Sequence, residues 1–398
     1  MEKYMQCIDC GEKFEEQPIC RCKKCNGLLE IKFKLIAGDF DLKEVRKRKF
    51  NLWRYVELIP AKRNISLNEG GTPLYECKNL SNELNVKLFV KNEGANPTGS
   101  FKDRGMTVGV SKAIEFGKKI TTCASTGNTS ASLAAYSAKA NLKCVVFIPS
   151  GKIAYGKLAQ ALIFGAKVIS IEGNFDKALE IVFKIGDKEE IYLLNSINPY
   201  RLEGQKTLGF EIFDELNHTP DRVILPVGNA GNISAIWKGF KEFYELGITY
   251  KKPKMTGIQA EKAMPIVNMF KNKGDFVPEK NPETIATAIR IGNPVSWKKA
   301  INAVYESSGY MESVSDEEIL NAQKLLARKE GIFVEPASAS SIAGLIKLID
   351  GGIVDKNEEI VCITTGNGLK DSNNVVDSCK NEIIYAKEKE IENLIKNL

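Results

Sequence analysis

Histidine is almost missing from this sequence, because the only one in 398 residues is His218. It lies in residues 217–221 (NHTPD), where asparagine, proline and aspartate are typical of a surface turn. Histidine is the most common general base of enzymes. If this chain is an enzyme, we therefore expect its proton transfers to depend on a lysine or a carboxylate.

Long apolar runs are missing as well. No stretch reaches the roughly 18 to 20 apolar residues that a membrane helix needs. The first residues (MEKYMQC) lack the apolar centre of a secretory signal. The net charge of +6 comes from scattered lysines, and the densest basic run, residues 43–49, is typical of a solvated helix face. We therefore expect a cytoplasmic protein that binds neither membranes nor nucleic acids.

Two common nucleotide-binding patterns, G-x-G-x-x-G and G-x-x-x-x-G-K-[ST], are also absent. Three other loops are rich in glycine and asparagine, and each follows a short apolar run that is typical of a strand: residues 125–130 (STGNTS), 228–232 (GNAGN) and 365–371 (TGNGLKD). Glycine lets backbone N–H groups approach an anion, and a following helix adds a positive dipole end. Such loops meet at the carboxyl edge of an open parallel sheet, so they indicate one anion-binding site.

Lys102 lies in a fourth segment, residues 96–105 (NPTGSFKDRG). Its proline and glycine predict a loop, and the helix-compatible residues 106–116 follow, which puts Lys102 in the first turn of a helix. Burial in a cleft lowers the pKa of a lysine and makes it a nucleophile or base. A lysine with this role beside a phosphate-binding loop is the pattern of pyridoxal phosphate enzymes, in which the cofactor takes up electrons.

Cysteines crowd at the N-terminus, where five of the ten occur in the first 25 residues. Two C-x-x-C pairs, Cys7 with Cys10 and Cys22 with Cys25, predict a structural zinc site in a small ribbon of residues 1–35. Cys20 is a fifth candidate ligand, and reduced structural thiols or a redox role are the alternatives. The other cysteines are dispersed, which fits a reducing compartment.

Strand patterns alternate with helix patterns along the rest of the chain. We expect strands at residues 88–91, 120–123, 144–149, 166–171, 191–194, 223–227 and 360–364. Residues 315–329 predict a helix in which Ser315 and Glu318 form a capping box, residues 331–338 a strand and the start of a helix, and the tail from residue 381 a charged helix. This alternation predicts an α/β fold with parallel sheets covered by helices.

The segment around Lys102 and the three loops resemble the four signature segments of fold-type II pyridoxal phosphate enzymes. They occur in the same order, and the resemblance covers about residues 70–371. Within that group the chain resembles the threonine synthases, because residues 195–207 (NSINPYRLEGQKT) match them. Dehydratases of the same fold resemble this segment only at its Gly-Gln end and usually lack an arginine at the position of Arg201.

The resemblance implies the fold of the tryptophan synthase β subunit, with two open, twisted, mostly parallel sheets. It implies a large cofactor-binding domain of residues 36–92 and 195–398 and a small mobile domain of residues 93–194, beside the ribbon. Homodimers are common in this family, so we expect a homodimer.

The resemblance also implies which residues bind pyridoxal phosphate. Lys102 would form the Schiff base, Asn128 would contact the ring hydroxyl, and Thr365 would face the pyridine nitrogen. The cofactor phosphate would be bound by the backbone of one loop, consisting of Gly228, Asn229, Ala230, Gly231 and Asn232.

The substrate implied by the resemblance is O-phospho-L-homoserine, which reacts with water to give L-threonine and phosphate. Its expected contacts are Ser125 and Thr129, with Asn195, Ser196 and Arg201 at its phosphate. A guanidinium suits that place because it binds phosphate with two parallel hydrogen bonds. Glu335 and Lys206 stay undecided between a functional and a structural role.

Three alternatives stay open at this point. A cysteate synthase, which uses phosphoserine and sulfite, and a threonine dehydratase would keep the fold and change the substrate. Arg201 speaks against the dehydratase more than against the phosphoserine enzyme. A zinc-ribbon binding protein with an inactive α/β body would belong to another class, and the intact segments around Lys102 speak against it.

Overall fold

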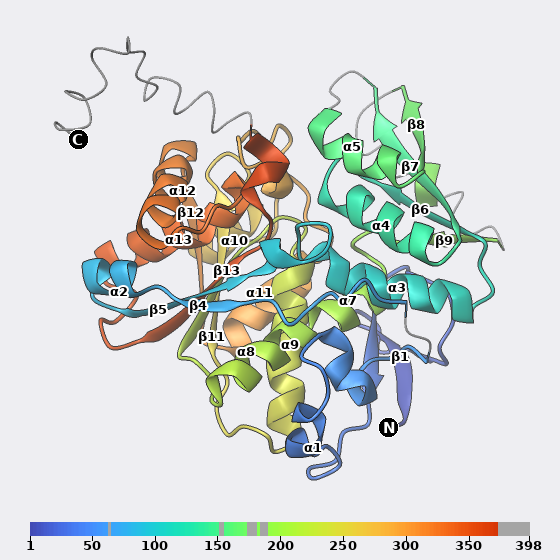
Figure 1. Ribbon diagram of the computed structural model, residues 1–398, viewed down its shortest axis with the longest axis horizontal. Helices are drawn as coiled ribbons and strands as arrows, with labels where there is room; N and C mark the ends of the chain where they lie inside the picture. The colour runs from blue at the N-terminus through green and yellow to red at the C-terminus, as the bar shows by residue number, and fades with distance from the viewer. Residues whose placement is uncertain (63–64, 151–154, 173–180, 184–189, 373–398) are drawn as a thin grey trace, which may run out of the picture.

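The strands of this computed structural model form three separate sheets (Figure 1). The structure describes residues 1–62, 65–150, 155–172, 181–183 and 190–372. Within these ranges, no helix is long and apolar enough to cross a membrane. The expected tail helix from residue 381 lies outside the described residues.

The largest sheet has six strands in the order β12-β11-β10-β13-β5-β4. Neighbouring strands are parallel except for the antiparallel pair of β4 and β5. The strand bounds are β4 (Leu74–Glu76), β5 (Lys87–Asn92), β10 (Arg222–Pro226), β11 (Lys254–Ala260), β12 (Tyr310–Val314) and β13 (Glu359–Thr364). All residues of β10 and β13 are buried, as expected for central strands covered on both faces.

Helices cover the two faces of this sheet, because successive strand side chains point in opposite directions. In β10, Ile224 packs on one side, against α2 (Lys78–Leu84), α12 (Asp316–Glu330) and α13 (Pro336–Asp350). Val223 and Leu225 pack on the other side, against α8 (Thr207–Leu216), α9 (Gly231–Glu245), α10 (Pro265–Asn272) and α11 (Trp297–Glu306). Figure 1 shows α12 and α13 on one side of the sheet and α8 and α9 on the other.

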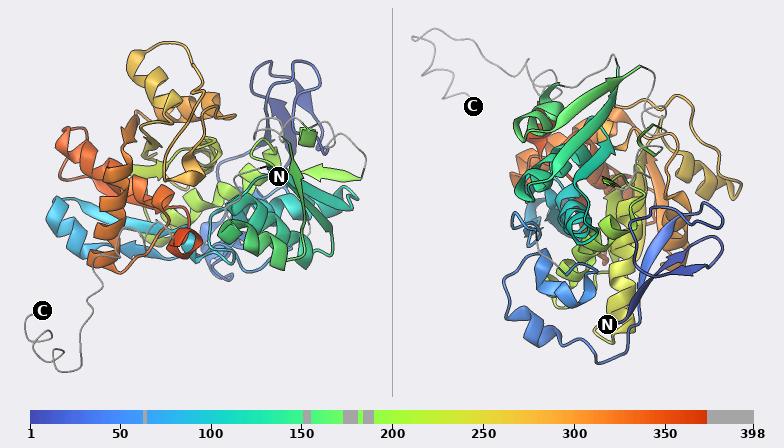
Figure 2. Two further views of the ribbon diagram at one scale, coloured as in Figure 1. Left: turned by 90° about the horizontal axis from the view of Figure 1, so that it is seen from above. Right: turned by 90° about the vertical axis from the view of Figure 1, so that its right-hand side faces the viewer.

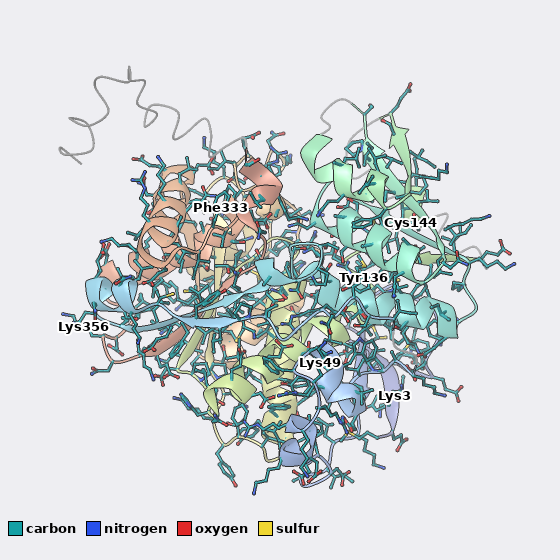
Figure 3. The ribbon with its side chains drawn as sticks, in the orientation of Figure 1. Lys3, Lys49, Tyr136, Cys144, Phe333 and Lys356 are labelled. Atoms are coloured by element: carbon teal, nitrogen blue, oxygen red, sulfur yellow. The ribbon has the colours of Figure 1, made fainter. Side chains whose placement is uncertain are left out.

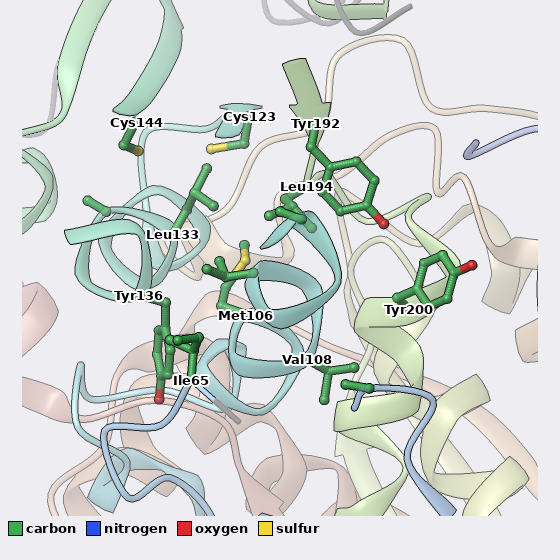
Figure 4. Packing of buried hydrophobic residues seen from close by; sticks show 14 of the residues in the cluster. Ile65, Met106, Val108, Cys123, Leu133, Tyr136, Cys144, Tyr192, Leu194 and Tyr200 are labelled. Carbon is green, nitrogen blue, oxygen red and sulfur yellow. The ribbon is translucent and has the colours of Figure 1, made fainter. Parts of the chain in front are cut away.

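The second sheet has four parallel strands in the order β8-β7-β6-β9. Their bounds are β6 (Ile120–Ala124), β7 (Lys143–Pro149), β8 (Lys167–Ile171) and β9 (Ile191–Leu193), and the helices beside them are α3 (Lys102–Glu115), α4 (Asn128–Lys139) and α5 (Tyr155–Ile163). Met106 of α3, Leu133 of α4 and Cys123 of β6 are fully buried in one cluster (Figure 4). Tyr136, labelled in Figure 3, belongs to the same core, and its hydroxyl donates to Glu69 Oε2 at 2.7 Å.

The third sheet is the N-terminal ribbon, with β1 (Lys3–Cys7), β2 (Lys13–Phe14) and β3 (Leu29–Phe33) in the antiparallel order β2-β1-β3. Two short helical segments follow it, α1 (Leu42–Arg46) and η1 (Leu52–Leu58). The ribbon lies beside α9 (Figure 2), where Lys238 Nζ donates to the carbonyl of Ile31. Helix α7 (Pro199–Gln205) lies between α3 and α9 and also contacts β3.

Each of the seven expected strands is present, with ends within one residue of the prediction. The capping box of Ser315 and Glu318 is confirmed at the start of α12. The sequence did not predict β11 and β12, because glycine and polar residues interrupt their apolar patterns. The strand expected within residues 331–338 is wrong, because Val334 pairs only with Asn367 in an isolated bridge before α13 begins.

Candidate active site

Lys102 is the first residue of α3, and the loop before it is fixed by the carboxylate of Asp103. Asp103 accepts hydrogen bonds from Thr98 N at 2.7 Å, from the Thr98 hydroxyl at 2.5 Å and from the Ser132 hydroxyl at 2.5 Å. Gly99 has a φ of +80°, a left-handed conformation that glycine adopts without steric cost. These contacts join the lysine loop to α3 and α4 and fix where the Lys102 side chain begins.

The pKa of Lys102 is lowered to about 7, because the half-buried side chain is partly shielded from water and because the positive charge of Arg201 lies nearby. The carboxylate of Glu335 acts in the opposite direction. Lys102 Nζ lies 3.6 Å from the centroid of the Phe101 ring. A neutral amine is therefore available near pH 7, as a nucleophile or base requires.

This pKa predicts how Lys102 reacts with an amine-selective acylating reagent in protein freed of any bound cofactor. Labelling of Lys102, followed by peptide mass spectrometry, should rise as the pH passes about 7. An ordinary lysine should react only near its pKa of about 10.4. Arg201→Gln removes a positive neighbour and should move the midpoint up, whereas Glu335→Gln removes a negative one and should move it down. A midpoint near 10 in the wild type would contradict the assignment.

Glu335 and Asn128 meet across the two larger sheets, at the start of α13 and the start of α4. Asn128 Nδ2 donates to both carboxylate oxygens of Glu335 at 3.1 Å, and both residues are buried. Asn128 Oδ1 is buried and has no hydrogen-bond partner among the described residues. This contact places Glu335, which the sequence left undecided, at the site, and it leaves one acceptor of Asn128 free for a ligand.

Thr365 lies at the carboxyl end of β13, where its backbone oxygen accepts from Phe101 N at 3.0 Å. Its hydroxyl lies 3.0 Å from the hydroxyl of Ser338 on α13, which also accepts from Gly366 N at 2.8 Å. A Cβ on Gly366 would come within 2.5 Å of Glu335 Oε1, so a larger residue there would displace the Glu335 carboxylate. The sequence did not predict Ser338 as a site residue. The only indication was its position one helical turn after Glu335.

The loop of residues 228–232 follows β10 and leads into α9, which begins at Gly231. Ala230, its N-cap, has a left-handed φ of +65°. Asn232 is 8% exposed, and neither side-chain polar atom has a hydrogen-bond partner within the described part of the chain. The N-terminus of a 15-residue helix with unpaired donors suits an anion such as a phosphate.

Arg201 lies in α7, whose first turn is capped by the side chain of Asn198. It is 2% exposed, and no carboxylate in the described ranges forms an ion pair with it. Its Nη1 donates to the carbonyl of Leu194 at 3.1 Å, and its Nε has no partner there. Burial lowers the pKa of the guanidinium to about 10. A buried cation without an anion is unusual, and such a site suits an anionic ligand.

The other expected substrate contacts lie near the end of β6. Both polar atoms of the Asn195 amide pair with the backbone of Ala124, at 2.9 Å and 3.0 Å. The Ser125 hydroxyl accepts from Gly127 N at 3.2 Å. Thr129 and Ser196 are half-buried. Asn195 therefore joins β6 to the segment before α7, with its amide already hydrogen-bonded.

The remaining lysine and histidine candidates have structural partners. Lys206 is fully buried and pairs with Glu203 at 2.6 Å and Glu242 at 2.8 Å, so its role is structural. His218 lies on an exposed turn, 2.5 Å from a carboxylate oxygen of Glu359. Neither residue forms a hydrogen bond with Lys102, Glu335 or Arg201 in the described part of the chain.

Four cysteines of the ribbon lie together. The sulfur atoms of Cys7, Cys10, Cys22 and Cys25 are all within 4.8 Å of one another. Cys20 lies outside this cluster, where its sulfur contacts the carbonyl of Leu193 and the side chain of Asn198, each at 3.8 Å. Two sulfurs from each C-x-x-C pair in such proximity fit the donor set of a structural zinc site.

The polar atoms around Lys102 fit a phosphate-bearing cofactor. Asn128, Arg201 and Asn232 each have at least one buried polar atom for which the described residues supply no partner. Buried polar groups are normally hydrogen-bonded, so unpaired atoms in neighbouring loops indicate a ligand site. The residues present therefore suit pyridoxal phosphate, with Lys102 for its aldehyde and the start of α9 for its phosphate.

Comparisons with known proteins agree with this site. A profile of the pyridoxal-phosphate dependent enzymes matches residues 65–366. The chain is 63% identical to the threonine synthase of Methanocaldococcus jannaschii over 374 residues, which cover 92% of each chain. It is 57% identical to the threonine synthase of Methanosarcina acetivorans over 382 residues, which cover 95% of this chain and 94% of that one.

Solved structures of lower identity share the fold. The processed form of threonine deaminase isoform 2 from Solanum lycopersicum has a TM-score of 0.67 at 21% identity, covering 86% of this chain and 95% of that chain. Maize serine racemase has a TM-score of 0.67 at 19% identity, covering 86% and 97%. The expected α/β fold of fold-type II is thus confirmed. With these matches and the unpaired polar atoms around Lys102, the chain belongs to the family of pyridoxal-phosphate dependent enzymes.

Proposed function

We propose that this chain catalyses the threonine synthase reaction, in which O-phospho-L-homoserine and water give L-threonine and phosphate. The identity of 63% to a threonine synthase over 92% of both chains is the observation that supports it most. The buried, unpaired guanidinium of Arg201 agrees with it, because a substrate phosphate needs a cationic donor. The likeness to threonine deaminase is limited to the fold at 21% identity.

Pyridoxal phosphate, when bound, would supply an electron sink for the substrate carbons. We propose that Lys102 binds its aldehyde carbon, that residues 228–232 bind its phosphate, and that Asn128 Oδ1 accepts from its ring hydroxyl. Thr365 would face its pyridine nitrogen. A hydroxyl holds a proton on that nitrogen less firmly than an aspartate, so Lys102 and the substrate phosphate must contribute more to the reaction.

Lys102 would act as the proton carrier of the reaction. Its pKa of about 7 leaves a neutral amine, which can take a proton from Cα of the substrate after the substrate's amino group displaces it. Proton transfer at Cβ and the departure of phosphate from Cγ follow, and water then adds its oxygen at Cβ. Lys102 would return one proton to Cγ, which becomes the methyl group, before water adds, and one to Cα before threonine leaves. The new hydroxyl comes from water, so one water is consumed for each phosphate released.

Arg201, Ser125, Thr129 and Ser196 would orient the substrate, with Asn195 holding the segment that bears Ser196. We propose that residues 93–194 move as a small domain and exclude water before the phosphate leaves. Contacts across the two larger sheets support this proposal. Asn128 donates to Glu335, and Lys370 Nζ donates to the carbonyl of Thr98 at 2.6 Å and to the side chain of Gln160.

The test is phosphate release by purified protein loaded with pyridoxal phosphate. We expect threonine and phosphate in a one-to-one ratio from O-phospho-L-homoserine. Parallel reactions with O-phospho-L-serine plus sulfite and with L-threonine alone serve as comparisons. Activity only with phosphoserine would replace the proposal with cysteate synthesis, and ammonia release from L-threonine alone would replace it with a dehydratase.

We further propose that Cys7, Cys10, Cys22 and Cys25 bind one structural zinc ion, that the protein acts in the cytoplasm and that it forms a homodimer. Nine described cysteines form no disulfide, as expected in a reducing compartment. Metal analysis of protein purified without chelator should give about one zinc per chain, because four thiolates complete one tetrahedral site. Cys22→Ser should lose it, whereas Cys20→Ser should keep it. Sedimentation of the purified protein tests the dimer.

A further inference from the structure

The ribbon contacts the segment of residues 195–201, which includes three of the proposed substrate-binding residues and is called the phosphate segment below. Ile197 of this segment is buried in one apolar cluster with Leu28 of the ribbon, and Cys20 packs against that cluster. The sulfur of Cys20 also lies 3.8 Å from Asn198 Nδ2. The ribbon thus covers the phosphate segment from outside.

Asn198, which Cys20 contacts, determines how α7 begins. Its Oδ1 accepts from the backbone N–H groups of Tyr200 at 3.0 Å and Arg201 at 3.4 Å, and its Nδ2 donates to the carbonyl of Leu193 at 2.8 Å. Capping of this kind fixes the first turn of a helix. A shift of Cys20 would therefore be transmitted to the backbone N–H of Arg201 through the side chain of Asn198.

Tyr200, the residue before Arg201, forms a second contact with the ribbon. It is fully buried, and its hydroxyl lies 3.3 Å from the carbonyl of Gln17 and 3.6 Å from the sulfur of Met5. Figure 4 shows its ring beside that of Tyr192 at the edge of the α3 cluster. The ring also packs edge-on against Phe116, with 5.6 Å between centroids.

Gln17 and Cys20 both lie in the ribbon loop of residues 11–21, between Cys10 and Cys22. The sulfurs of these two cysteines are 3.7 Å apart, so a metal bound there would join the two ends of the loop. The Arg201 side chain has one described hydrogen bond, from Nη1 to the carbonyl of Leu194. Its position therefore depends on the backbone of α7.

From these contacts we infer that the ribbon is a positioning element for phosphate binding. The metal closes the loop of residues 11–21, the loop holds the first turn of α7 through Asn198 and Tyr200, and that turn places Arg201. The inference rests on the proposed function, because it takes Arg201 as the group that binds the substrate phosphate. Tyr200 and Cys20 are positioning residues, since neither is expected to touch the substrate.

Tyr200→Phe tests the inference, because it removes the hydroxyl and leaves the ring packed against Phe116. The KM for O-phospho-L-homoserine should rise about two- to tenfold, the usual effect of one lost hydrogen bond. The Kd for inorganic phosphate, measured by calorimetry on the loaded enzyme, should rise by the same factor. The kcat and the visible absorbance of the cofactor should stay the same.

Lys298→Ala is the matched control. Lys298 on α11 pairs with Asp9 of the ribbon at 2.6 Å. Its side chain is 52% exposed, and exposed ion pairs contribute little. This variant removes a ribbon contact but leaves the contacts of Asn198 and Tyr200 intact, so KM and the phosphate Kd should stay at the wild-type values.

Removal of zinc with a chelator gives a second measurement. It should raise the KM and the phosphate Kd of the wild type, and raise them less in Tyr200→Phe, because the two changes act through the same contact. If zinc removal unfolds the chain, the Tyr200→Phe and Lys298→Ala pair decides alone. An unchanged phosphate Kd in Tyr200→Phe would overturn the inference. A weakened phosphate Kd in a protein that does not turn over O-phospho-L-homoserine would overturn the proposed function and support the inference.

Discussion

Replacing Lys102 with alanine is expected to remove turnover almost completely, together with the visible absorbance of bound pyridoxal phosphate. Lys102 is the only lysine that the structure places at the start of α3 beside Glu335 and Arg201, with a pKa lowered to about 7. The variant loses both the covalent attachment of the cofactor and the proton carrier. Because proton transfer alone contributes up to about 10⁴-fold, kcat should fall by at least that factor. Phosphate release and an absorbance spectrum measure the two losses.

Two further variants separate the role of this amine from general damage. Lys102→Arg keeps a positive charge but cannot attack an aldehyde near pH 7, so it should be as inactive as Lys102→Ala. Lys139→Ala changes an exposed lysine at the end of α4 and should be fully active. Circular dichroism of all three should match the wild type. Substantial turnover in Lys102→Ala would contradict the assignment of Lys102 as the catalytic amine.

Replacing Arg201 with methionine is expected to reduce kcat/KM for O-phospho-L-homoserine by about 30- to 4,000-fold. This range corresponds to the roughly 2–5 kcal/mol lost when one partner of a buried, hydrogen-bonded charge pair is removed. Inhibition by inorganic phosphate should weaken in parallel, whereas the absorbance of the bound cofactor should persist. Arg201→Lys keeps the charge without the two parallel donors and should fall between the wild type and Arg201→Met.

The thermal stability of Arg201→Met should differ from that of the matched variant Arg104→Met. Arg104 is as deeply buried as Arg201 but donates to Glu93 and Glu211, with Nε and Nη1 each 2.6 Å from a carboxylate oxygen. Arg104→Met leaves the buried carboxylate of Glu93 without its cation and leaves Glu211 with Lys91, 3.1 Å away, so it should lose about 3–5 kcal/mol of stability. Arg201→Met removes a buried charge that no described carboxylate neutralises and loses one hydrogen bond, to the carbonyl of Leu194, so its Tm without substrate should stay the same or rise.

Arg104 and Arg201 show that the tertiary structure determines whether a buried arginine has a carboxylate partner. Both arginines lie in segments that resemble signature segments of the family. The residues next to them in the sequence do not indicate which one is paired with a carboxylate. Arg104 meets Glu211, which is 107 residues away, whereas Arg201 meets no carboxylate in the described structure. A clear loss of Tm in Arg201→Met, with phosphate inhibition unchanged, would mean that Arg201 is structural.

Local chemistry determined much of the fold. The runs of apolar and β-branched residues before the three loops predicted β6, β10 and β13, because such residues are enriched in strands that are buried between helices. Glycine and asparagine predicted the turns that follow them. The proline and glycine before Lys102 predicted a helix start, and the spacing of Ser315 and Glu318 predicted the capping box. Each of these signals acts over a few residues, so a single sequence contains it.

The tertiary structure alone decided how the site residues pair. Glu335 at the start of α13 contacts Asn128 at the start of α4. No local sequence pattern predicts this contact. The Asn195 amide is taken up by the backbone of Ala124. Cys20 contacts Asn198 instead of joining the four-cysteine cluster. Such contacts join residues 71 to 207 positions apart. The packing of whole helices and sheets, which the sequence encodes only collectively, brings them together.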